Sequence, residues 1–297
     1  MTVYLKRLYA KYRRHMDYLL QDHLMREEEF ISMAAPLLAD MKRIEVSDCV
    51  SPGFLFFREW EDDRRHIEIP VFGYDADDRK TAVRLFQKLA NETVRDHACD
   101  FSVNLYSNDT VSVQAFSMMQ FGTMSEICIR RLDPAPISAS PWEIRSLSKP
   151  EISADWHRLW DATGRIIAHL RESPVFYPGS EFTEKVYRDF YMDEATELIA
   201  AYDQSMLAGI IEWNREKNGL LSPSEPSVNT GEIYVYPAYR GTGLARQLLQ
   251  YAENAAFSAG SQWMWVQHGT ANPNACGFWD QHFQVYQYEL VRSISPV

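Results

Sequence analysis

The chain has 297 residues, with 30 Lys and Arg against 41 Asp and Glu, which gives a net charge of −11. This acidic balance argues against a general nucleic-acid-binding protein, which needs a basic surface, and it is compatible with a cationic small molecule or basic peptide as partner. The four cysteines, Cys49, Cys99, Cys128 and Cys276, lack the spacing of a disulfide scaffold or a metal site, so we expect reduced thiols and no metal.

The N-terminal segment is basic, with five Lys and Arg residues from Lys6 to Arg14, and it lacks the uninterrupted apolar run of a signal peptide. Such a cluster could bind an anion or a membrane surface, but the solvated face of a helix is the favoured interpretation. The longest uncharged run, from Asn254 to Trp279, holds too many polar residues to span a bilayer. We therefore expect a cytoplasmic protein with no membrane partner, as a monomer or a homodimer.

The first half of the chain has the apolar periodicity of alternating strands and helices. In chain order the pattern predicts a strand over 66–72, a helix over 81–97, a strand over 101–106, a helical segment within 110–122 and a strand over 126–131.

A segment with three prolines, Asp133–Pro141, separates the two halves of the chain. Proline fixes the backbone and removes a hydrogen-bond donor, so this segment indicates a linker. The predicted division is a first domain at 1–133, a linker at 134–141 and a second domain at 142–297. The first half carries a net charge of −4 and the second a net charge of −7.

The second half has a predicted order of β-α-α-β-β-β-α-β-α-β. These elements are expected at 142–148, 154–170, 183–192, 196–204, 206–214, 231–237, 243–260, 262–267, 272–283 and 285–294. The polar segment 214–230 is predicted to be a mobile loop, because it contains prolines and has no apolar periodicity.

The most informative motif joins the strand at 231–237 to the helix that follows it. The sequence from Val235 to Ala245 contains a strand-ending proline, Arg240, and the glycines Gly241 and Gly243. Glycine permits positive φ and a close approach to a ligand, and the first-turn N–H groups of a helix have no intrahelical partner. Such a turn binds phosphate at the positive end of the helix dipole. The alternative is an ordinary βα turn that contains glycines. The full pattern of strand, proline, arginine, glycine pair and helix is more specific than a pair of glycines alone.

This motif resembles the acyl-CoA pyrophosphate signature of the GCN5-related N-acetyltransferase (GNAT) superfamily. In that family the strand before the turn splays from the next strand, and the pantetheine arm of the acyl-CoA lies in the splay. The resemblance assigns the arm to Ile233, Tyr234 and Val235. It assigns the pyrophosphate to Arg240, Gly241, Thr242, Gly243, Leu244 and Ala245, with Arg246 beside them.

The resemblance continues downstream, where the segment from Asn272 to Phe283 matches a second family motif. It implies that Asn272 lies near the arm of the cofactor. Many family members have at position 279 a Tyr that protonates the leaving thiolate, whereas this chain has Trp279. Indole has only a hydrogen-bond donor and no ionisable proton at neutral pH. Another group or solvent must then supply the proton, or the domain binds acyl-CoA without turnover.

The reaction that the resemblance implies is direct attack of a neutral amine on the thioester, which requires a base. Candidate bases are Glu232 on the strand before the turn, Glu212 on the preceding strand and His268 after the next strand. The alternative for each glutamate is a place on a solvated strand face without a catalytic role, and the alternative for His268 is a hydrogen-bonded structural role. The main-chain N–H of Val235 is the candidate donor to the developing oxyanion.

The first half resembles a degenerate repeat of the second half. Residues 66–72 are similar to residues 231–237, and a helix and then a strand follow both segments. Its turn contains Asp75, Asp77 and Asp78 and no glycine pair, and these carboxylates would repel a pyrophosphate. We therefore predict an α/β fold of two GNAT-like domains, each a mixed, mostly antiparallel sheet flanked by helices with a splayed central strand pair. The alternative for the first half is a coincidental α/β pattern, because short apolar runs are ambiguous.

Only the second domain is expected to bind acetyl-CoA or another acyl-CoA. The expected acceptor is a primary amine of a small molecule or peptide, and the walls of its site are expected from Glu172–Phe182, with Phe176, Tyr177 and Phe182, and from the 214–230 loop. The alternative is a non-catalytic acyl-CoA-binding or regulatory module.

Overall fold

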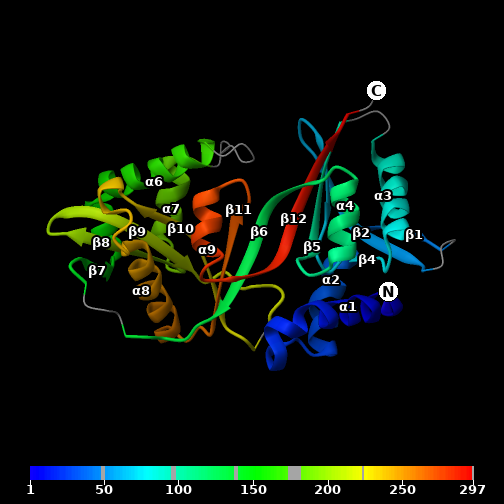
Figure 1. Cartoon of the computed structure of the whole chain (residues 1–297), viewed down its shortest axis with the longest axis horizontal. Helices are drawn as coiled ribbons and strands as arrows, with labels where there is room; N and C mark the ends of the chain where they lie inside the picture. The colour runs from blue at the N-terminus through cyan, green and yellow to red at the C-terminus, as the bar shows by residue number, and fades with distance from the viewer. Residues whose placement is uncertain (48–50, 95–97, 137–139, 173–181, 223, 296–297) are drawn as a thin grey trace. The chain divides into compact units, whose positions relative to one another are not determined.

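The computed structural model describes residues 1–297 except 48–50, 95–97, 137–139, 173–181, 223 and 296–297. Its internal contacts divide the chain into two units (Figure 1). Unit 1 comprises Met1–Cys128, Leu220–Pro223 and Val285–Val297, and unit 2 comprises Ile129–Gly219 and Ser224–Gln284. None of the helices in these described segments is both long and apolar enough to cross a membrane.

Unit 1 is a mixed sheet with helices, and its strands lie in the order β1-β2-β3-β5-β12-β6, with β4 paired to β2. All described pairings within β1, β2, β3, β4, β5 and β12 are antiparallel except that of β3 with β5. The elements are α1 (Thr2–Leu20), α2 (Glu27–Ala39), β1 (Lys42–Val46), β2 (Gly53–Glu61), β3 (Arg65–Ile69), β4 (Tyr74–Asp75), α3 (Arg79–Thr93), β5 (Cys99–Tyr106), α4 (Thr110–Met118), β6 (Gly122–Arg131) and β12 (Gln284–Ile294).

One face of this sheet packs against α3 and α4. The buried residues Leu85, Phe86 and Leu89 recur at helical spacing along α3 and join a core that includes Phe101 of β5 and Phe116 of α4. Burial of this apolar surface is what holds the two helices on the sheet. The predicted order of strand, helix, strand, helix and strand between 66 and 131 is confirmed by β3, α3, β5, α4 and β6.

The basic residues of α1 form ion pairs with the acidic turn that precedes α3. Arg7 Nη2 lies 2.6 Å from Asp75 Oδ2, and Arg14 Nη1 lies 3.7 Å from Asp77 Oδ1. Lys11, only 5 % exposed, lies with its Nζ 2.8 Å from Asp109 Oδ2. The expectation of a fully solvated basic face is therefore wrong for Lys11, because a buried carboxylate on α4's N-cap pairs with it.

Replacement of Lys11 by Met is expected to lower the free energy of unfolding by about 3–5 kcal/mol, since Asp109 would remain buried without its cation. Urea unfolding at pH 7 measures this. The matched control is Arg13→Met, which breaks an exposed i,i+4 contact with Asp17 and should change stability by less than about 0.5 kcal/mol. Equal effects of the two changes would contradict the assigned role of Lys11.

The ion pair between Lys11 and Asp109 also predicts how the free energy of unfolding depends on pH. Burial acts to raise the pKa of Asp109, but the ammonium of Lys11 and hydrogen bonds from Lys11 and Ser112 outweigh it, and the net pKa is lowered. A lowered folded-state pKa contributes stability above the unfolded value of about 3.9, and that stability is lost as the pH falls through the folded value. The acid limb of the stability curve should be shallower in Lys11→Met.

Unit 2 is a five-stranded sheet in the order β11-β10-β9-β8-β7. Its neighbouring strands are antiparallel except β10 and β11, which are parallel. The elements are β7 (Glu143–Ser146), α5 (Lys149–Ala154), α6 (Trp156–Glu172), α7 (Glu184–Met192), β8 (Thr196–Asp203), β9 (Met206–Asn214), β10 (Ser227–Val235), α8 (Leu244–Ser258), β11 (Trp263–Gly269) and α9 (Pro273–Trp279).

The helices of unit 2 lie on both faces of its sheet (Figure 1). Residues of α6 and α7 share a core with Leu198, Ile210 and Tyr234, which point to one face. Helix α8 packs on the other face, where a Cβ at Gly209 would lie 3.1 Å from Leu248. A mixed, mostly antiparallel sheet flanked by helices is the architecture that the sequence predicts.

Two segments differ from the sequence-based expectation. Within 214–230, Leu220 and Leu221 are buried and 227–230 form the first half of β10, so the segment is not a wholly mobile polar loop. The last strand, β12, belongs to unit 1 although the predicted second domain runs to 297. The reason is its antiparallel pairing with β5, which runs over eight residues from Gln287 to Ile294.

Candidate active site

The turn between β10 and α8 has an open helix N-terminus. A 3₁₀ turn at Pro237–Tyr239 leads to Gly241 at φ 75° and Gly243 at φ 88°, and α8 begins at Leu244. No side chain caps the helix, and residues 240–243 are exposed. A Cβ at either glycine would meet nothing within 4 Å, so positive φ, not crowding, is what requires glycine here. The first-turn N–H groups are therefore available to an anion.

Arg240 is held next to this turn by a hydrogen bond to the end of β10. Its Nε donates a hydrogen bond of 3.0 Å to the carbonyl oxygen of Val235, and its guanidinium lies 5.6 Å from the ring centre of Tyr234. Thr242 Oγ1 donates to the carbonyl oxygen of Tyr239 and closes the turn. The arginine thus adds a fixed positive charge at the base of the helix N-terminus.

Strands β10 and β11 separate before β10 ends. They pair in parallel only from Ser227 with Trp263 to Asn229 with Trp265, although β10 continues to Val235. A β-bulge after Thr230 turns the second half of β10, which stays paired with β9. Beyond the bulge, β10 therefore presents an open edge on the side away from β9.

The N–H of Val235 lies on this open edge. The next residue, Tyr236, donates its N–H to Ala208 of β9 at 3.0 Å. Successive residues of a strand direct their backbone groups to opposite sides, so the N–H of Val235 points away from β9. Ile233 has the same orientation as Val235 by its two-residue spacing.

The sequence and fold of this region are similar to known acetyltransferases. Residues 164–283 match the sequence model of the Acetyltransferase (GNAT) family. This stretch contains the turn, the splayed strands and α9. Residues 164–283 form a GNAT-family domain.

One solved structure with a TM-score above 0.5 supports the same fold, and two others are reported for comparison only. A GCN5-related N-acetyltransferase from Sphaerobacter thermophilus is 13 % identical, with a TM-score of 0.53, and the similarity covers 82 % of this chain and 81 % of that one. A GCN5-related N-acetyltransferase from Kribbella flavida is 12 % identical, with a TM-score of 0.43 and coverage of 88 % and 93 %. A tandem GNAT protein from the clavulanic acid biosynthesis pathway is 10 % identical, with a TM-score of 0.45 and coverage of 98 % and 96 %. A comparison with curated proteins found no match.

Two of the predicted bases of the GNAT domain are neighbours at the bulge. Glu212 of β9 is 1 % exposed, and its Oε1 accepts hydrogen bonds from the N–H groups of Gly231 and Glu232 at 3.0 and 3.1 Å. Its Oε2 is buried and makes no hydrogen bond within the described residues. Burial, together with the nearby charge of Glu232, raises the pKa of Glu212 to about 8.

Glu232 is half-buried and is bonded to a tyrosine that the sequence did not single out. Tyr187 of α7 donates its hydroxyl to Glu232 Oε1 at 2.8 Å. Burial raises the pKa of Glu232, and the hydrogen bond from Tyr187 partly offsets this. Burial and the charge of Glu232 also raise the pKa of Tyr187. Tyr187 lies on the apolar face of α7, and no spacing in the sequence relates it to a residue 45 positions later.

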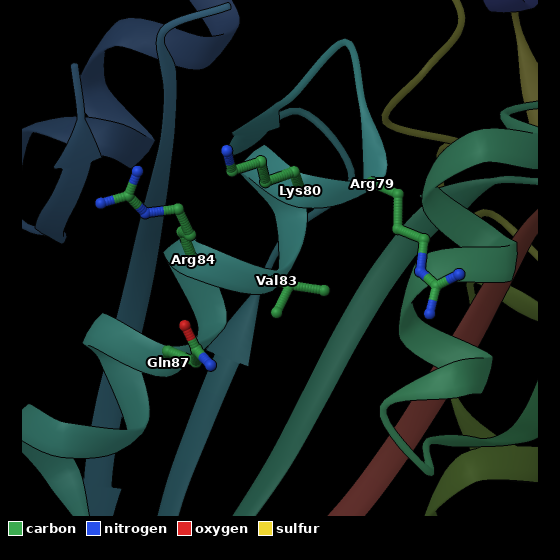
Figure 2. Close-up of a pocket in the computed structure, with 5 residues that line it drawn as sticks. All are labelled: Arg79, Lys80, Val83, Arg84 and Gln87. Carbon is green, nitrogen blue, oxygen red and sulfur yellow. The ribbon is translucent and has the colours of Figure 1, made fainter. Parts of the chain in front are cut away.

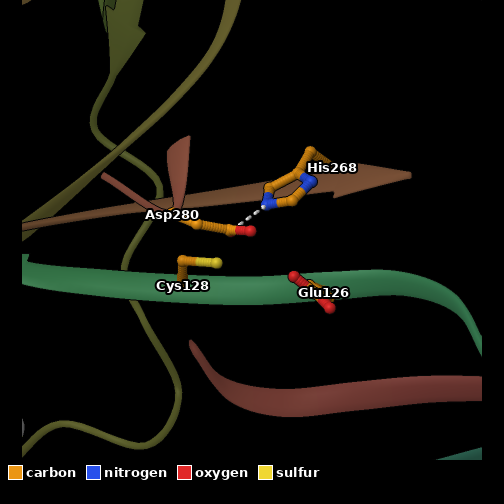
Figure 3. A group of neighbouring side chains, drawn as sticks. All are labelled: Glu126, Cys128, His268 and Asp280. Atoms are coloured by element: carbon orange, nitrogen blue, oxygen red, sulfur yellow. Dashed lines mark ion pairs between the residues drawn. The ribbon is translucent and has the colours of Figure 1, made fainter. Parts of the chain in front are cut away.

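His268, the third predicted base, lies in a different environment. It is at the end of β11 and is 7 % exposed, and its Nε2 is 3.5 Å from Asp280 Oδ1 (Figure 3). Burial lowers the pKa of His268, with Asp280 acting in the opposite direction. No contact in the described structure joins it to Glu212 or Glu232, so the three candidates do not form one cluster.

Asn272 is the N-cap of α9. Its Oδ1 accepts from the N–H groups of Asn274 and Ala275, both at 3.2 Å, and lies 3.2 Å from His169 Nε2 of α6. The asparagine therefore connects the start of α9 to the end of α6.

Trp279 is a core residue of this domain. It is 3 % exposed, and its ring makes edge-on contacts with the rings of Phe278 and Phe283. Among the tyrosines of this domain, Tyr191 has its hydroxyl 3.2 Å from Thr163 Oγ1, and Tyr234 is buried beside Tyr236. None of the three offers an acid at the place where the family motif has its tyrosine.

The predicted acceptor walls are described only in part. Phe176 and Tyr177 lie outside the described residues. Phe182, which precedes α7, packs near the ring of Tyr187, at 6.2 Å between ring centres. The remaining residues assigned to the cofactor are Leu244, which is buried under the turn, Ala245, which is half-buried, and Arg246, which is exposed.

Unit 1 has its own surface hollows. One of about 540 Å³ is lined by α3 side chains, which Figure 2 shows. These are Arg79, Lys80, Val83, Arg84 and Gln87. The helix N-terminus there is already capped, because Asp78 accepts from the N–H of Thr81 at 2.9 Å. The hollow therefore differs from the uncapped N-terminus of α8.

Unit 1 also lacks the splay. Its parallel pair, β3 and β5, stays in register over the whole of β3, from Arg65 with Cys99 to Ile69 with Val103. Pro70 follows at once, and it cannot donate a hydrogen bond, so β3 ends without a bulged extension. The splayed pair expected in both domains is thus present only in unit 2 among the described strands.

Proposed function

We propose that the GNAT domain transfers an acetyl group from acetyl-CoA to a primary amine of a small molecule or peptide. The observation that carries this proposal is the combination of an uncapped helix N-terminus, an open edge on β10 and a buried carboxyl, Glu212, next to that edge. Family membership supports acyl transfer, and the choice of donor and acceptor is our own inference.

The residues present fit the diphosphate end of acyl-CoA. Gly241 and Gly243 leave room for phosphate oxygens, the first-turn N–H groups of α8 would donate to them, and Arg240 adds a positive charge. The open edge at Ile233 and Val235 would hold the pantetheine arm by main-chain hydrogen bonds. When bound, acyl-CoA supplies the activated thioester.

Glu212 is the group that we assign as general base. A base works best when its pKa lies near the working pH, and a value of about 8 meets that condition. Glu212 would take the proton of the incoming ammonium, and the N–H of Val235 would donate to the oxygen on which negative charge develops. Tyr187 would hold Glu232 in place beside it.

A second candidate function follows from Trp279. Because this buried indole replaces the family's acid, the domain could bind acyl-CoA without transferring the acyl group. In the enzyme that we propose, solvent or another group protonates the departing thiolate.

Acetyl-CoA is expected to raise the melting temperature of the protein. A ligand that binds only the folded state at 100 times its dissociation constant stabilises it by about 2.7 kcal/mol, which is several degrees for a chain of this size. A thermal-shift titration measures binding, and spectrophotometric detection of released CoA against a panel of amines measures transfer.

The outcomes separate the two candidates. A shift together with amine-dependent release supports the transferase. A shift with no release on any amine supports the binding module. No shift at millimolar acetyl-CoA contradicts both.

A further inference from the structure

The segment that joins β9 to β10 enters unit 1. Residues 220–223 belong to unit 1, whereas the chain on either side of them belongs to unit 2. The whole β9–β10 segment comprises residues 215–226, of which 223 lies outside the described residues. It joins the strand that carries Glu212 to the strand that carries Glu232. Unit 1 therefore contains the middle of a segment whose two ends continue into the strands of the candidate active site.

Helix α1 contacts this segment through a buried tyrosine. Tyr12, which is 0 % exposed, donates its hydroxyl to the carbonyl oxygen of Leu220 at 2.8 Å. The same hydroxyl accepts a hydrogen bond of 3.0 Å from the N–H of Met25, just before α2. Burial raises the pKa of Tyr12, so the hydroxyl keeps the proton that it donates. One hydroxyl thus connects the segment to α1 and to the chain that leads into α2.

The residues around this contact are also buried. Leu220 and Leu221 are buried, and so is Ser222. Hydrogen bonds from Arg26 are the main reason that the pKa of Glu29 on α2 is lowered, and Ser222 contributes a further hydrogen bond. Apolar burial together with satisfied polar groups makes the two helices a docking site for the middle of the segment.

The ends of the segment are bonded to the strands next to Glu212. Asn214, the last residue of β9, accepts the N–H of Glu216 at 3.0 Å and donates its side-chain amide to Asn229 Oδ1 of β10 at 3.2 Å. Thr230 donates its hydroxyl to the carbonyl oxygen of Glu212 at 2.6 Å. Short covalent and hydrogen-bonded links therefore connect the docked middle of the segment to the pairing of β9 with β10 at Glu212.

We propose that Tyr12 is a positioning residue for the GNAT domain: its bond to Leu220 holds the β9–β10 segment and so keeps the two strands closed against water at Glu212. Unit 1, which lacks the glycine pair and the splay, then supports the candidate active site without binding the cofactor. The importance of Glu212 rests on the proposed function, whereas the hold of Tyr12 on the segment does not.

Limited digestion with trypsin tests this hold on the full chain. Lys217 is exposed and is followed by the buried Asn218, so cleavage after Lys217 requires the segment to open. Tyr12→Phe keeps the ring and removes the hydroxyl. The loss of one buried hydrogen bond should speed this cleavage by about 3–10-fold, as followed by mass spectrometry well below the melting temperature.

The matched control is Tyr9→Phe on the same helix. The hydroxyl of Tyr9 donates to the carbonyl oxygen of Met25 at 3.3 Å and not to the segment, so its loss should leave cleavage after Lys217 unchanged. Melting curves check that both variants are folded. Equal cleavage rates in Tyr12→Phe and the natural chain would overturn the proposal.

The pH profile of turnover tests the positioning role. Burial is the main cause of the raised pKa of Glu212, about 8, so water admitted between the strands should lower it. The midpoint of the profile should fall below 8 in Tyr12→Phe and stay at about 8 in Tyr9→Phe. A smaller folded fraction would lower turnover at every pH without moving the midpoint. Three titratable groups near Glu212 remain in both variants, namely Glu232 of β10 and Tyr187 and Tyr191 of α7.

The outcomes separate this proposal from the proposed function. Faster cleavage together with a lower midpoint in Tyr12→Phe supports the positioning role. Amine-dependent release of CoA with an unmoved midpoint would overturn that role alone. Absence of a thermal shift with acetyl-CoA would overturn the proposed function and the positioning role with it, and the cleavage rates would still decide whether Tyr12 holds the segment.

Discussion

Gly243→Asp is expected to abolish binding of acetyl-CoA while the chain remains folded. The residue has φ 88° and is the N-cap of α8. A carboxylate there would accept hydrogen bonds from the N–H groups that we assign to the pyrophosphate, and its charge would repel the phosphates. We expect the thermal shift to disappear and the affinity, measured by calorimetry, to fall by at least about 100-fold, which is roughly 2.7 kcal/mol.

The matched control is Gly260→Asp, just beyond the other end of the same helix. Gly260 also has positive φ, at 95°, and a Cβ there would meet open space, so the same change imposes similar backbone strain. It should lower stability but leave the affinity for acetyl-CoA unchanged. Equal affinity in Gly243→Asp and the natural chain would remove the site from this turn.

Glu212→Gln is expected to lower turnover by about 10²–10⁴-fold, the range for loss of a general base, with little change in acetyl-CoA affinity. The amide keeps the shape of the side chain and can still accept from Gly231 and Glu232. Steady-state kinetics of CoA release, together with the thermal shift, measure the two effects. Glu197→Gln on the adjacent strand β8 is the control and should leave both unchanged.

The pH profile gives an independent check on Glu212. A base must be deprotonated to act, and the pKa of Glu212 is raised to about 8, so turnover should rise with pH through about 8. Removal of the neighbouring charge in Glu232→Gln should lower the pKa of Glu212 and move this limb to lower pH. If Glu232 were the base, Glu232→Gln would instead abolish turnover at every pH, and Glu212→Gln would have the smaller effect.

Much of the local structure follows from the sequence because its signals are local. The glycines of the turn, the proline before it and the apolar stripe of Leu244, Leu248 and Leu249 lie close together in the chain, and they determine a strand, a turn and an amphipathic helix. Much of the order of elements follows from apolar periodicity in the same way, although the prediction contains no element for α2, β1, β2, β4 or α5. The family resemblance rests on these same short segments.

The relations between distant residues needed the tertiary structure. Periodicity places Glu212 and Glu232 on strands, but only the β-bulge sets the N–H groups of Gly231 and Glu232 against Glu212. Tyr187 meets Glu232 because α7 packs on that face of the sheet. The pairing of β12 with β5 joins residues 287–294 to residues 99–106, which are far apart in the chain, and no linker composition could reveal it.

The sequence by itself determined the glycine-containing turn before α8, the α/β class and the absence of such a glycine pair from the turn before α3, since each depends on residues close together in the chain. The tertiary structure decided that Lys11 is buried against Asp109, that only unit 2 has a splayed strand pair among the described strands, and that Tyr187 donates a hydrogen bond to Glu232. Burial and contact across long sequence separations set those features, and the same burial sets the pKa values on which the proposed chemistry depends.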